Sequence, residues 1–457
     1  MSLHRYSQYK DSGTQWLGEV PEHWLIGKIH SFAKRESGHT PSRQHPEYWE
    51  NCTIPWFTLA DVWQLRSGNV KYVYETKELV SELGLANSSA RLLPAGTVVL
   101  SRTASVGYSA IMGRDMATTQ DFVNWTCYPR CFPEFLLYVL RGMRTEFDRL
   151  MMGSTHQTIY MPDIAKLTMA LPPKEEQSAI VAFLDRETST LDMLIAEQEK
   201  LLTLLVEKRQ ATISHAVTRG LDLDVPMKDS GVAWLGEVPA HWDVLPIKRV
   251  ITSIEQGWSP QCENFPVEDV QEWGVMKVGC VNGGKFDASE NKKLPSELEP
   301  IPAYSLRKGD LLISRANTRE LVGGSAVVPD DFENLLLCDK LYRIRTNLEA
   351  CIPSFLAAFL SVPVARAQIE LGATGASSSM LNIAQSVILE LSVPFPDATE
   401  QATIMEFVSA ETNKLDTLAA DVERAIDLLK ERRSALIAAA VTGKIDVRNA
   451  ALEARAA

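Results

Sequence analysis

Three short groups of residues in this sequence have types and spacings that could support chemistry. Residues 290–292, with the sequence ENK, resemble half of a metal-dependent nuclease site. Cys127 and Cys131 are spaced so that they could supply one pair of ligands to a metal ion. Residues 443–444 (GK) match the last glycine and the lysine of a phosphate-binding loop. Each group needs further residues before it could act.

The sequence does not supply those further residues. No acidic residue in a Pro-Asp setting precedes 290–292, and no second Cys/His pair of suitable spacing accompanies the two cysteines. Ile445 stands where a phosphate-binding loop requires Ser or Thr. We therefore predict a solvated charged loop at 290–292. We predict buried free thiols at Cys127 and Cys131, because seven scattered cysteines do not suggest a disulfide framework.

Other common catalytic patterns are also missing from the sequence. It contains no GxGxxG opening a helix, no HExxH, no GxSxG, and no Asn/Asp-Pro-Pro-aromatic motif of the amino-methyltransferase kind. We therefore predict that the chain is not an enzyme and binds no cofactor or metal ion itself. An enzyme with cryptic motifs, either a DNA methyltransferase or a nuclease, remains an alternative.

The bulk composition indicates a soluble globular protein of the cytoplasm. The chain has 457 residues, 45% hydrophobic and 23% charged, which suits two to four domains. No apolar run approaches the ~18 residues of a membrane span, and the N-terminus lacks the apolar core of a secretory signal. With a net charge of -12, any contact with nucleic-acid phosphates must come from local patches or from a partner.

A long-range internal repeat organises the chain. The phrase DSGTQWLGEVPEHW at 11–24 returns as DSGVAWLGEVPAHW at 229–242, with eleven of fourteen positions identical. We interpret its Trp and Pro residues as packing anchors where each globular unit begins. His23 and His241 precede the last Trp of each copy, and we interpret them as structural rather than catalytic.

A second pair of repeated segments predicts two long helices. Residues 171–222 align with residues 396–446, and Gly220 and Gly443 mark the expected helix ends. Each helix would span ~60 Å at about 1.5 Å per residue. Apolar residues recur in both at spacings of three and four, and each stripe finds its nearest partner in the other. The stripes are Ile180, Phe183, Leu184, Leu191, Leu194, Ile195, Leu201, Leu202 and Leu205, and Ile404, Phe407, Val408, Leu415, Leu418, Val422, Ile426, Leu429 and Leu436.

Between these landmarks lie short β-rich runs punctuated by Gly, Pro and Asn. The runs are GTVVLSR (96–102), WGVMKVGCV (273–281), GDLLISR (309–315) and KLYRIRT (340–346). The tryptophans predicted to lie in the cores of these stretches are Trp56, Trp63, Trp258 and Trp273.

The fold class predicted from this order is α+β. Two mixed α/β globular domains are separated by two long antiparallel helices that form a coiled coil, with a pseudo-two-fold internal repeat. Each Trp phrase would then lie against the closing end of the other half's helix. The predicted segments are a first domain at 1–170, a first helix at 171–220, a second domain at 221–395, a second helix at 396–445, and a disordered tail at 446–457.

This organisation resembles the specificity subunit of type I restriction–modification systems over nearly the whole chain. The resemblance is sharpest in the repeated Trp phrases and in three further stretches. These are SGHTPSRQHPEYWENCTIPWFTLADV (37–62), PAGTVVLSRTASVG (94–107) and PPKEEQSAI (172–180). The second-half counterpart of the last stretch, PDATEQATI, departs from the usual proline-lysine-glutamate wording but keeps the Glu-Gln pair.

The resemblance implies a DNA-recognition subunit. Each globular domain would be a target recognition domain that reads one half of a bipartite, asymmetric site on double-stranded DNA. The helix pair would set the spacing and dock two modification subunits, which would bind S-adenosylmethionine and methylate adenine. Separate restriction subunits, using ATP and Mg²⁺, would cleave unmodified DNA. A coiled-coil scaffold protein without DNA specificity is the remaining alternative.

Residues that read bases should be hydrogen-bonding side chains on loops. In the first domain the candidates are Thr40, Ser42, Arg43, Arg102, Thr103 and Ser105. In the second they are Gln256, Ser259, Lys277, Arg315, Asn317 and Arg319. Arg102 and Arg315 end matching strands, so positioning a phosphate or the fold itself is the alternative role for these two.

Overall fold

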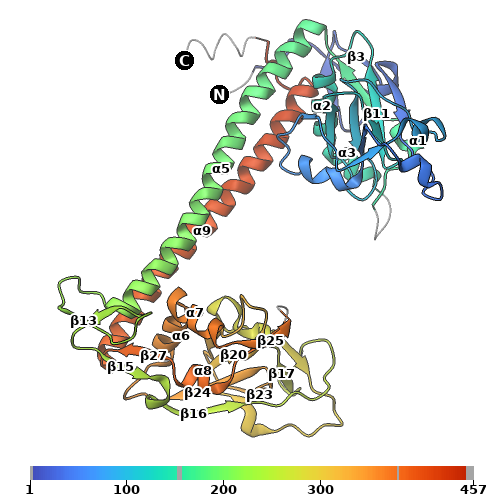
Figure 1. Cartoon of the computed structure of the whole chain (residues 1–457). Helices are drawn as coiled ribbons and strands as arrows, with labels where there is room; N and C mark the ends of the chain where they lie inside the picture. Colours follow the sequence, from blue (N-terminus) through green and yellow to red (C-terminus); the bar gives the residue numbers. More distant parts are fainter. Residues whose placement is uncertain (1–3, 152–156, 378–379, 449–457) are drawn as a thin grey trace. The chain divides into compact units, whose positions relative to one another are not determined.

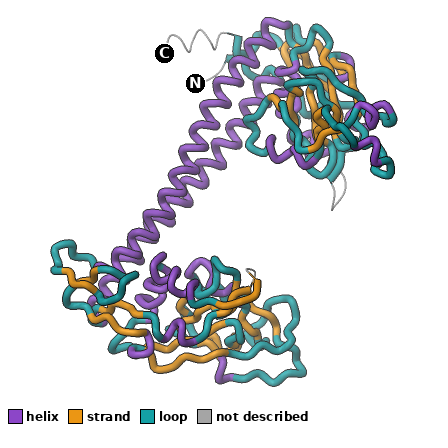
Figure 2. The backbone as a smooth tube through the Cα atoms, in the orientation of Figure 1, coloured by secondary structure: helices purple, strands orange, loops and turns teal. Residues whose placement is uncertain are grey.

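A computed structural model of the chain describes residues 4–151, 157–377 and 380–448. The chain forms two compact units, one from residues up to 200 together with those from 422 onward, and one from residues 201–421. Figures 1 and 2 display the elements of each unit. The two long helices, α5 (Lys174–Arg219) and α9 (Ala398–Val441), each contribute one half to each unit.

The main sheet of the first unit has the strand order β4-β11-β8-β9-β6 within the described residues. Its strands are β4 (Ala33–Ser37), β6 (Tyr72–Val73), β8 (Val98–Ser101), β9 (Ser109–Met112) and β11 (Phe122–Cys127). Since β11 runs antiparallel to both β4 and β8, those two strands end at the sheet edge where β11 begins. Residues after β4, after β8 and before β11 therefore share one edge.

Smaller elements complete the first unit. A second sheet contains β5 parallel to β10 and antiparallel to β7, β1 pairs with β2, and β3 pairs with β12. These strands are β1 (Tyr9–Asp11), β2 (Glu19–Pro21), β3 (Leu25–Lys28), β5 (Ile54–Phe57), β7 (Glu78–Val80), β10 (Ala117–Thr118) and β12 (Thr168–Leu171). The short helices are α1 (Glu82–Ala86), α2 (Pro133–Gly142), α3 (Arg144–Leu150) and α4 (Met161–Ile164), with 3₁₀ turns η1 (Ile29–Ser31), η2 (Pro46–Trp49) and η3 (Leu59–Leu65).

The second unit repeats the same pattern. Its sheet β16-β24-β20-β22 has the same antiparallel neighbours as β4-β11-β8-β9, and β17 lies parallel to β23 as β5 does to β10. The strands are β13 (Met227–Asp229), β14 (Glu237–Pro239), β15 (Asp243–Pro246), β16 (Ile251–Gln256), β17 (Gly274–Met276), β18 (Asn291–Lys293), β19 (Ser305–Leu306), β20 (Leu311–Ser314), β21 (Ala316–Asn317), β22 (Ser325–Val327), β23 (Phe332–Leu336), β24 (Leu341–Thr346), β25 (Thr374–Ser377), β26 (Met380–Asn382) and β27 (Ser392–Phe395).

The helices of the second unit also follow the first. They are α6 (Pro353–Ser361), α7 (Pro363–Leu371) and α8 (Gln385–Leu389), with 3₁₀ turns η4 (Ile247–Arg249), η5 (Val278–Gly284) and η6 (Pro302–Tyr304). Helix α6 packs on β20 and β22 as α2 packs on β8 and β9. Both α2 and α6 begin with Pro, whose fixed φ suits the first helical position. The internal repeat predicted from the sequence is thus a repeat of topology.

The long helices pack antiparallel within each unit. In the first unit the start of α5 lies beside the end of α9, where Arg433 Nε is 2.8 Å from Asp192 Oδ1. In the second unit the end of α5 lies beside the start of α9, where Arg209 Nε is 3.4 Å from Asp416 Oδ1. The two ion pairs occupy equivalent positions of the repeat, so the same helix contact is built twice.

Helix termination follows the predicted glycines. Gly220 and Gly443 have φ of +77° and +70°, a left-handed conformation that glycine adopts at helix ends without steric cost. A Cβ at position 443 would lie 2.3 Å from Pro21 Cδ, so this end of α9 can approach the first Trp phrase only without a side chain. Trp24 also packs in the same core as Ile180 and Val441. The phrase therefore contacts both helix ends, not only the closing end that we predicted.

Three predictions about local structure were wrong. The side chains of Leu194, Phe407 and Leu418 are 46%, 41% and 44% exposed, because a pair of helices buries only a narrow stripe of each. The run at 273–281 is a strand only over β17, after which η5 turns the chain. Trp63 lies on η3 with 66% of its surface exposed, whereas Trp56 is buried.

The predicted tail begins later than we expected. Val447 is buried in the first unit's core, because the chain after α9 returns along the N-terminal segment, where Asp446 N donates to His4 O at 2.7 Å. Residues 449–457 lie outside the described residues. No single helix in the described part of the chain is long and apolar enough to cross a membrane, although the bent pair α6–α7 passes that test when taken together.

Candidate functional site

The Glu-Gln pair at the start of each long helix joins that helix to its globular unit. The buried Gln177 accepts a hydrogen bond from Phe132 N at 2.9 Å and donates to Arg130 O and Pro172 O at 2.9 Å each. Gln401 makes the same three contacts, with Ile352 N, Ala350 O and Pro396 O, at 2.8 to 2.9 Å. Each glutamine thus ties the turn before α2 or α6 to its long helix.

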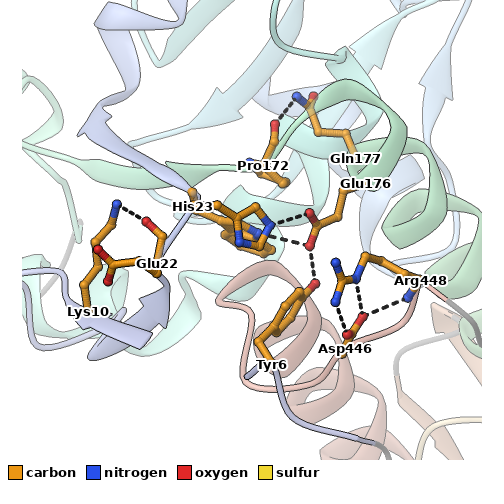
Figure 3. Close-up of polar contacts among 10 residues, drawn as sticks. Tyr6, Lys10, Glu22, His23, Pro172, Glu176, Gln177, Asp446 and Arg448 are labelled. Atoms are coloured by element: carbon orange, nitrogen blue, oxygen red, sulfur yellow. Dashed lines mark hydrogen bonds and ion pairs between the residues drawn. The ribbon is translucent and has the colours of Figure 1, made fainter. Parts of the chain in front are cut away.

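The neighbouring glutamates bind the Trp phrases, and Figure 3 shows Glu176 of the first unit. Glu176 accepts from Trp24 Nε1 at 3.1 Å and lies 2.9 Å from His23 Nε2. Glu400 repeats both distances with Trp242 and His241. The repeated histidines therefore connect the turn between two strands to the start of a long helix, which supports the structural interpretation of both.

The first unit adds a cluster from the two ends of the described chain. Tyr6 donates its hydroxyl hydrogen to Glu176, and Arg448 stacks over the Tyr6 ring at 4.9 Å. Burial, and then the hydrogen bond to Glu176, raises the pKa of the Tyr6 hydroxyl well above its usual value. The Arg448 guanidinium holds the pKa of Asp446 below its usual value. This cluster is structural, since its carboxylates are already engaged.

Several candidate base readers of the first unit meet at the shared edge of its main sheet. Thr40 Oγ1 donates to Gln120 Oε1 at 2.8 Å, and Arg102 Nε donates to Gln120 O at 3.0 Å. Thr103 forms an isolated bridge with Thr158. Ser105 N donates to Thr103 O at 2.6 Å and so lies in the same loop. The loops after β4 and β8 and before β11 are therefore fastened to each other through Gln120.

The second unit builds the same edge from different residues. The Ser259 hydroxyl donates to Asp339 Oδ1, and Arg315 Nη1 donates to Asp339 O at 3.2 Å. Asn317 lies on β21 directly after Arg315, and its Nδ2 is 3.4 Å from Ser314 Oγ. The guanidinium groups of Arg102 and Arg315 both donate hydrogen bonds to backbone carbonyls. These bonds favour a role for both arginines in positioning the loops.

Gln120 and Asp339 were missed by the sequence reasoning. Each pairs with a hydroxyl residue 80 positions earlier in the chain, Thr40 and Ser259 respectively. This equal separation in the two halves is a signal that an alignment of the halves could have supplied. We will call these two clusters the first and second hydroxyl–arginine edges: Thr40, Arg102 and Gln120, and Ser259, Arg315 and Asp339.

The remaining candidates are not part of the hydrogen-bonded clusters. Ser42 and Arg43 are exposed on the segment after β4, where the Arg43 guanidinium stacks over Trp49 at 4.9 Å and Nη2 is 3.3 Å from Glu78. Gln256 ends β16 and is exposed, as is Arg319. Lys277 is the N-cap residue of η5 and lines a hollow that Ser259 also lines. The structure therefore brings together seven of the twelve candidates in the two edge regions.

Two of the candidate catalytic groups are placed by the structure. The sulfur atoms of Cys127 and Cys131 are 4.0 Å apart as free thiols, and the described residues contain no group of His, Cys, Asp or Glu suited to a metal ion. The prediction of a solvated loop at 290–292 was wrong for Asn291. This residue is buried at the start of β18, where its amide bonds to Val267 N and Ala288 O.

Comparison with known proteins shows which family the segment around the first edge resembles. The family described as "Type I restriction modification DNA specificity domain" matches residues 21–203. The matched segment contains the whole first hydroxyl–arginine edge and the start of α5.

Similarity to curated relatives extends beyond residues 21–203. The EcoKI specificity subunit of Escherichia coli (strain K12) is 23% identical over 94% of this chain and 90% of its own length. The EcoEI specificity subunit of Escherichia coli is 27% identical, but the match covers 38% of this chain and 29% of that relative. The resemblance to specificity subunits drawn from the sequence is thus confirmed, and the names of these relatives state that they are specificity subunits of type I restriction enzymes.

A solved structure shares the fold. Its title is "Structural basis underlying complex assembly and conformational transition of the type I R-M system", and it matches with a TM-score of 0.68 at 15% identity. The match covers 92% of this chain and 98% of that one. At this identity the likeness concerns the fold alone.

Proposed function

We propose that this chain is the DNA-recognition subunit of a type I restriction–modification complex, in which each compact unit reads one half of a bipartite, asymmetric target. The observation that carries the proposal is the hydroxyl–arginine edge, built twice on equivalent strands with the same hydroxyl and arginine groups but with Gln120 in one unit and Asp339 in the other. An equivalent frame with unlike side chains around it is what two different half-sites on duplex DNA require, since the duplex offers equivalent backbones but different base edges.

The exposed side chains beside each edge would make the base contacts. Ser42 and Arg43 are exposed after β4, and Gln256 and Arg319 are exposed in the second unit. Thr103, Ser105 and Asn317 follow the arginines of the edges in the chain and lie next to them. Arg102 and Arg315 would orient the loops instead of reading sequence. A good bidentate contact is worth about 1–3 kcal/mol of discrimination against the wrong base.

The long helices would act as a spacer between the two readers. Neither helix has Pro or Gly within its bounds, and their antiparallel contact is built from the same ion pair in each unit. Half-sites on one face of B-DNA lie about 34 Å apart for each helical turn. A stiff spacer restricts the protein to one such distance, and it makes binding of the second half-site effectively intramolecular.

The partners and cofactors belong to the same proposal. Two modification subunits would dock on the helix pair, bind S-adenosylmethionine and methylate adenine in the cytoplasm. Restriction subunits would use ATP and Mg²⁺ for translocation and cleavage. This chain would contribute no catalytic group and bind no cofactor, which fits the incomplete catalytic patterns in its sequence.

Charge predicts that the chain depends on these partners for affinity. Phosphate contacts supply much of the affinity of DNA-binding proteins, and this chain carries a net charge of -12. Mobility-shift titrations at matched salt should therefore show weak DNA binding by the isolated chain and tight, sequence-selective binding when modification subunits are present. Tight selective binding by the chain alone would contradict the charge argument. No selective binding even with modification subunits would contradict the proposed function and favour a scaffold.

A further inference from the structure

A hollow of about 490 Å³ lies beside the second hydroxyl–arginine edge. Ser259 of that edge lines it, together with the residues that follow Ser259 and the end of β17. Three lysines from separate elements also line it: Lys277 at the cap of η5, Lys292 on β18, and Lys340 before β24. Three lysines that line one hollow make it a place that attracts anions.

The lysines are only weakly neutralised. Lys277 Nζ is 3.9 Å from Glu290 Oε2, at the outer limit of an ion pair. Lys292 Nζ lies 3.4 Å from the neutral amide oxygen of Asn264. For Lys292 and Lys340, no ion pair is recorded within the described residues. Glu290 and Asp287 are the acidic neighbours of Lys277, and Asp339 precedes Lys340. None of these three carboxylates lines the hollow, whose charged lining residues are the three lysines.

The equivalent position in the first unit is built differently. Lys277 caps η5 directly after β17, and Thr58 caps η3 directly after β5. The neutral Thr58 therefore stands where the second unit has the cationic Lys277, and Thr58 forms a capping box with the buried Asp61. The two units therefore differ in charge at one equivalent place beside their edges.

We propose that this hollow binds a backbone phosphate of the DNA at the second half-site. The inference rests on the proposed function and assigns the second unit a larger share of the electrostatic affinity. Lysine is a compact cation without acceptor groups, so it suits a phosphate better than the mixed donor and acceptor pattern of a base edge. In a chain of net charge -12, a local group of lysines of this kind supplies attraction that the overall charge opposes.

The test compares two full-length variants in the presence of modification subunits. One carries Lys277→Gln, Lys292→Gln and Lys340→Gln together. The control carries Lys308→Gln, an exposed lysine before β20 and hence at the opposite end of that strand from the edge. Affinity for two double-stranded DNA fragments, one with the target and one of mixed sequence, is measured by fluorescence anisotropy over a range of salt concentrations.

The proposal predicts weaker binding of both fragments by the triple variant. The slope of log K against log salt should become shallower by about 0.9 for each phosphate that the variant no longer neutralises, while Lys308→Gln leaves it unchanged. An unchanged slope, or weaker binding of the target fragment alone, would overturn the inference but not the proposed function. If the wild-type chain with modification subunits shows no affinity for either fragment at low salt, the inference and the proposed function are both wrong.

A chemical footprint provides a second measurement without substitutions. Cys262 is a partly exposed thiol that lines the hollow, and Cys52 is a partly exposed thiol outside it. Bound DNA should slow the alkylation of Cys262 by N-ethylmaleimide several-fold relative to that of Cys52. Equal rates for Cys262 with and without saturating DNA would overturn the placement of the phosphate.

Discussion

At the scale of single residues, adjacent side chains in the Glu-Gln pair perform separate tasks. The glutamate binds the Trp phrase, and the glutamine binds the turn before α2 or α6. The sequence showed that the pair recurs, and it predicted structural histidines beside the tryptophans. It could not show that Glu176 and Trp24 meet, because they are 152 residues apart in the chain and only the closed fold joins them.

Replacing Gln177 should be costly. Gln177→Ala removes three hydrogen bonds and leaves Phe132 N without its partner in the core, so we expect the free energy of unfolding to fall by at least about 2 kcal/mol. Gln8→Ala, an exposed glutamine of the same unit, should change it by less than about 0.5 kcal/mol. Chemical denaturation measures both values. Equal stability of the two variants would show that the contact is dispensable.

Tyr6 gives the first unit a stability limit at alkaline pH. Its folded-state pKa is raised above the usual 10.0, so its contribution is complete below about pH 10 and is lost as the pH rises further. Tyr6→Phe should lower the melting temperature near neutral pH by removing the bond to Glu176. It should also make the decline above about pH 10 shallower than that of the wild type. Parallel pH–melting curves for the two proteins would contradict this role.

At the scale of elements, the two long helices were the most predictable part of the chain. Their 3.6-residue periodicity and flanking Pro and Gly define them locally, and the structure places their ends within a few residues of the predicted ones. The exposed Leu194, Phe407 and Leu418 could not be predicted from periodicity, because the partner helix determines which side of a broad stripe is covered. The short strands beside the edges were harder to predict, since their register depends on partners far along the sequence.

Gly443 offers a test of how α9 meets the Trp phrase. Gly443→Ala must accept both a left-handed backbone and a Cβ that would lie 2.3 Å from Pro21 Cδ. Gly13→Ala shares the φ of +70° but has open space around its Cβ, so it isolates the backbone cost of about 1–2 kcal/mol. Thermal unfolding should show a clearly larger loss of stability for Gly443→Ala. Equal losses would mean that the close approach does not exist.

At the scale of the whole molecule, duplication explains both the success and the limits of the sequence reasoning. Matching phrases revealed two equivalent halves and the family they resemble. The residues that differ between halves carry the specificity, and for them the repeat provides no guide. Gln120, Asp339, Lys292 and Lys340 were therefore found only once the fold brought them beside their partners.

The two units should be exchangeable readers. Replacing residues 25–170 with the equivalent segment of another specificity subunit should change one half of the recognised sequence and preserve the other, because each edge is completed within its own unit. Adding a whole heptad to one long helix should alter the spacing between half-sites or abolish binding, since the antiparallel ion pairs would lose register. Changes in both half-sites after a domain exchange would show that the units do not read independently.

The most direct test of the central claim is the pattern of methylated bases in DNA from cells with and without this chain, with modification subunits supplied in both. The account predicts methylated adenines at a two-part, asymmetric sequence with a fixed gap, present only when the chain is present. Identical methylation patterns in the two cultures, or methylation at a single undivided sequence, would contradict it.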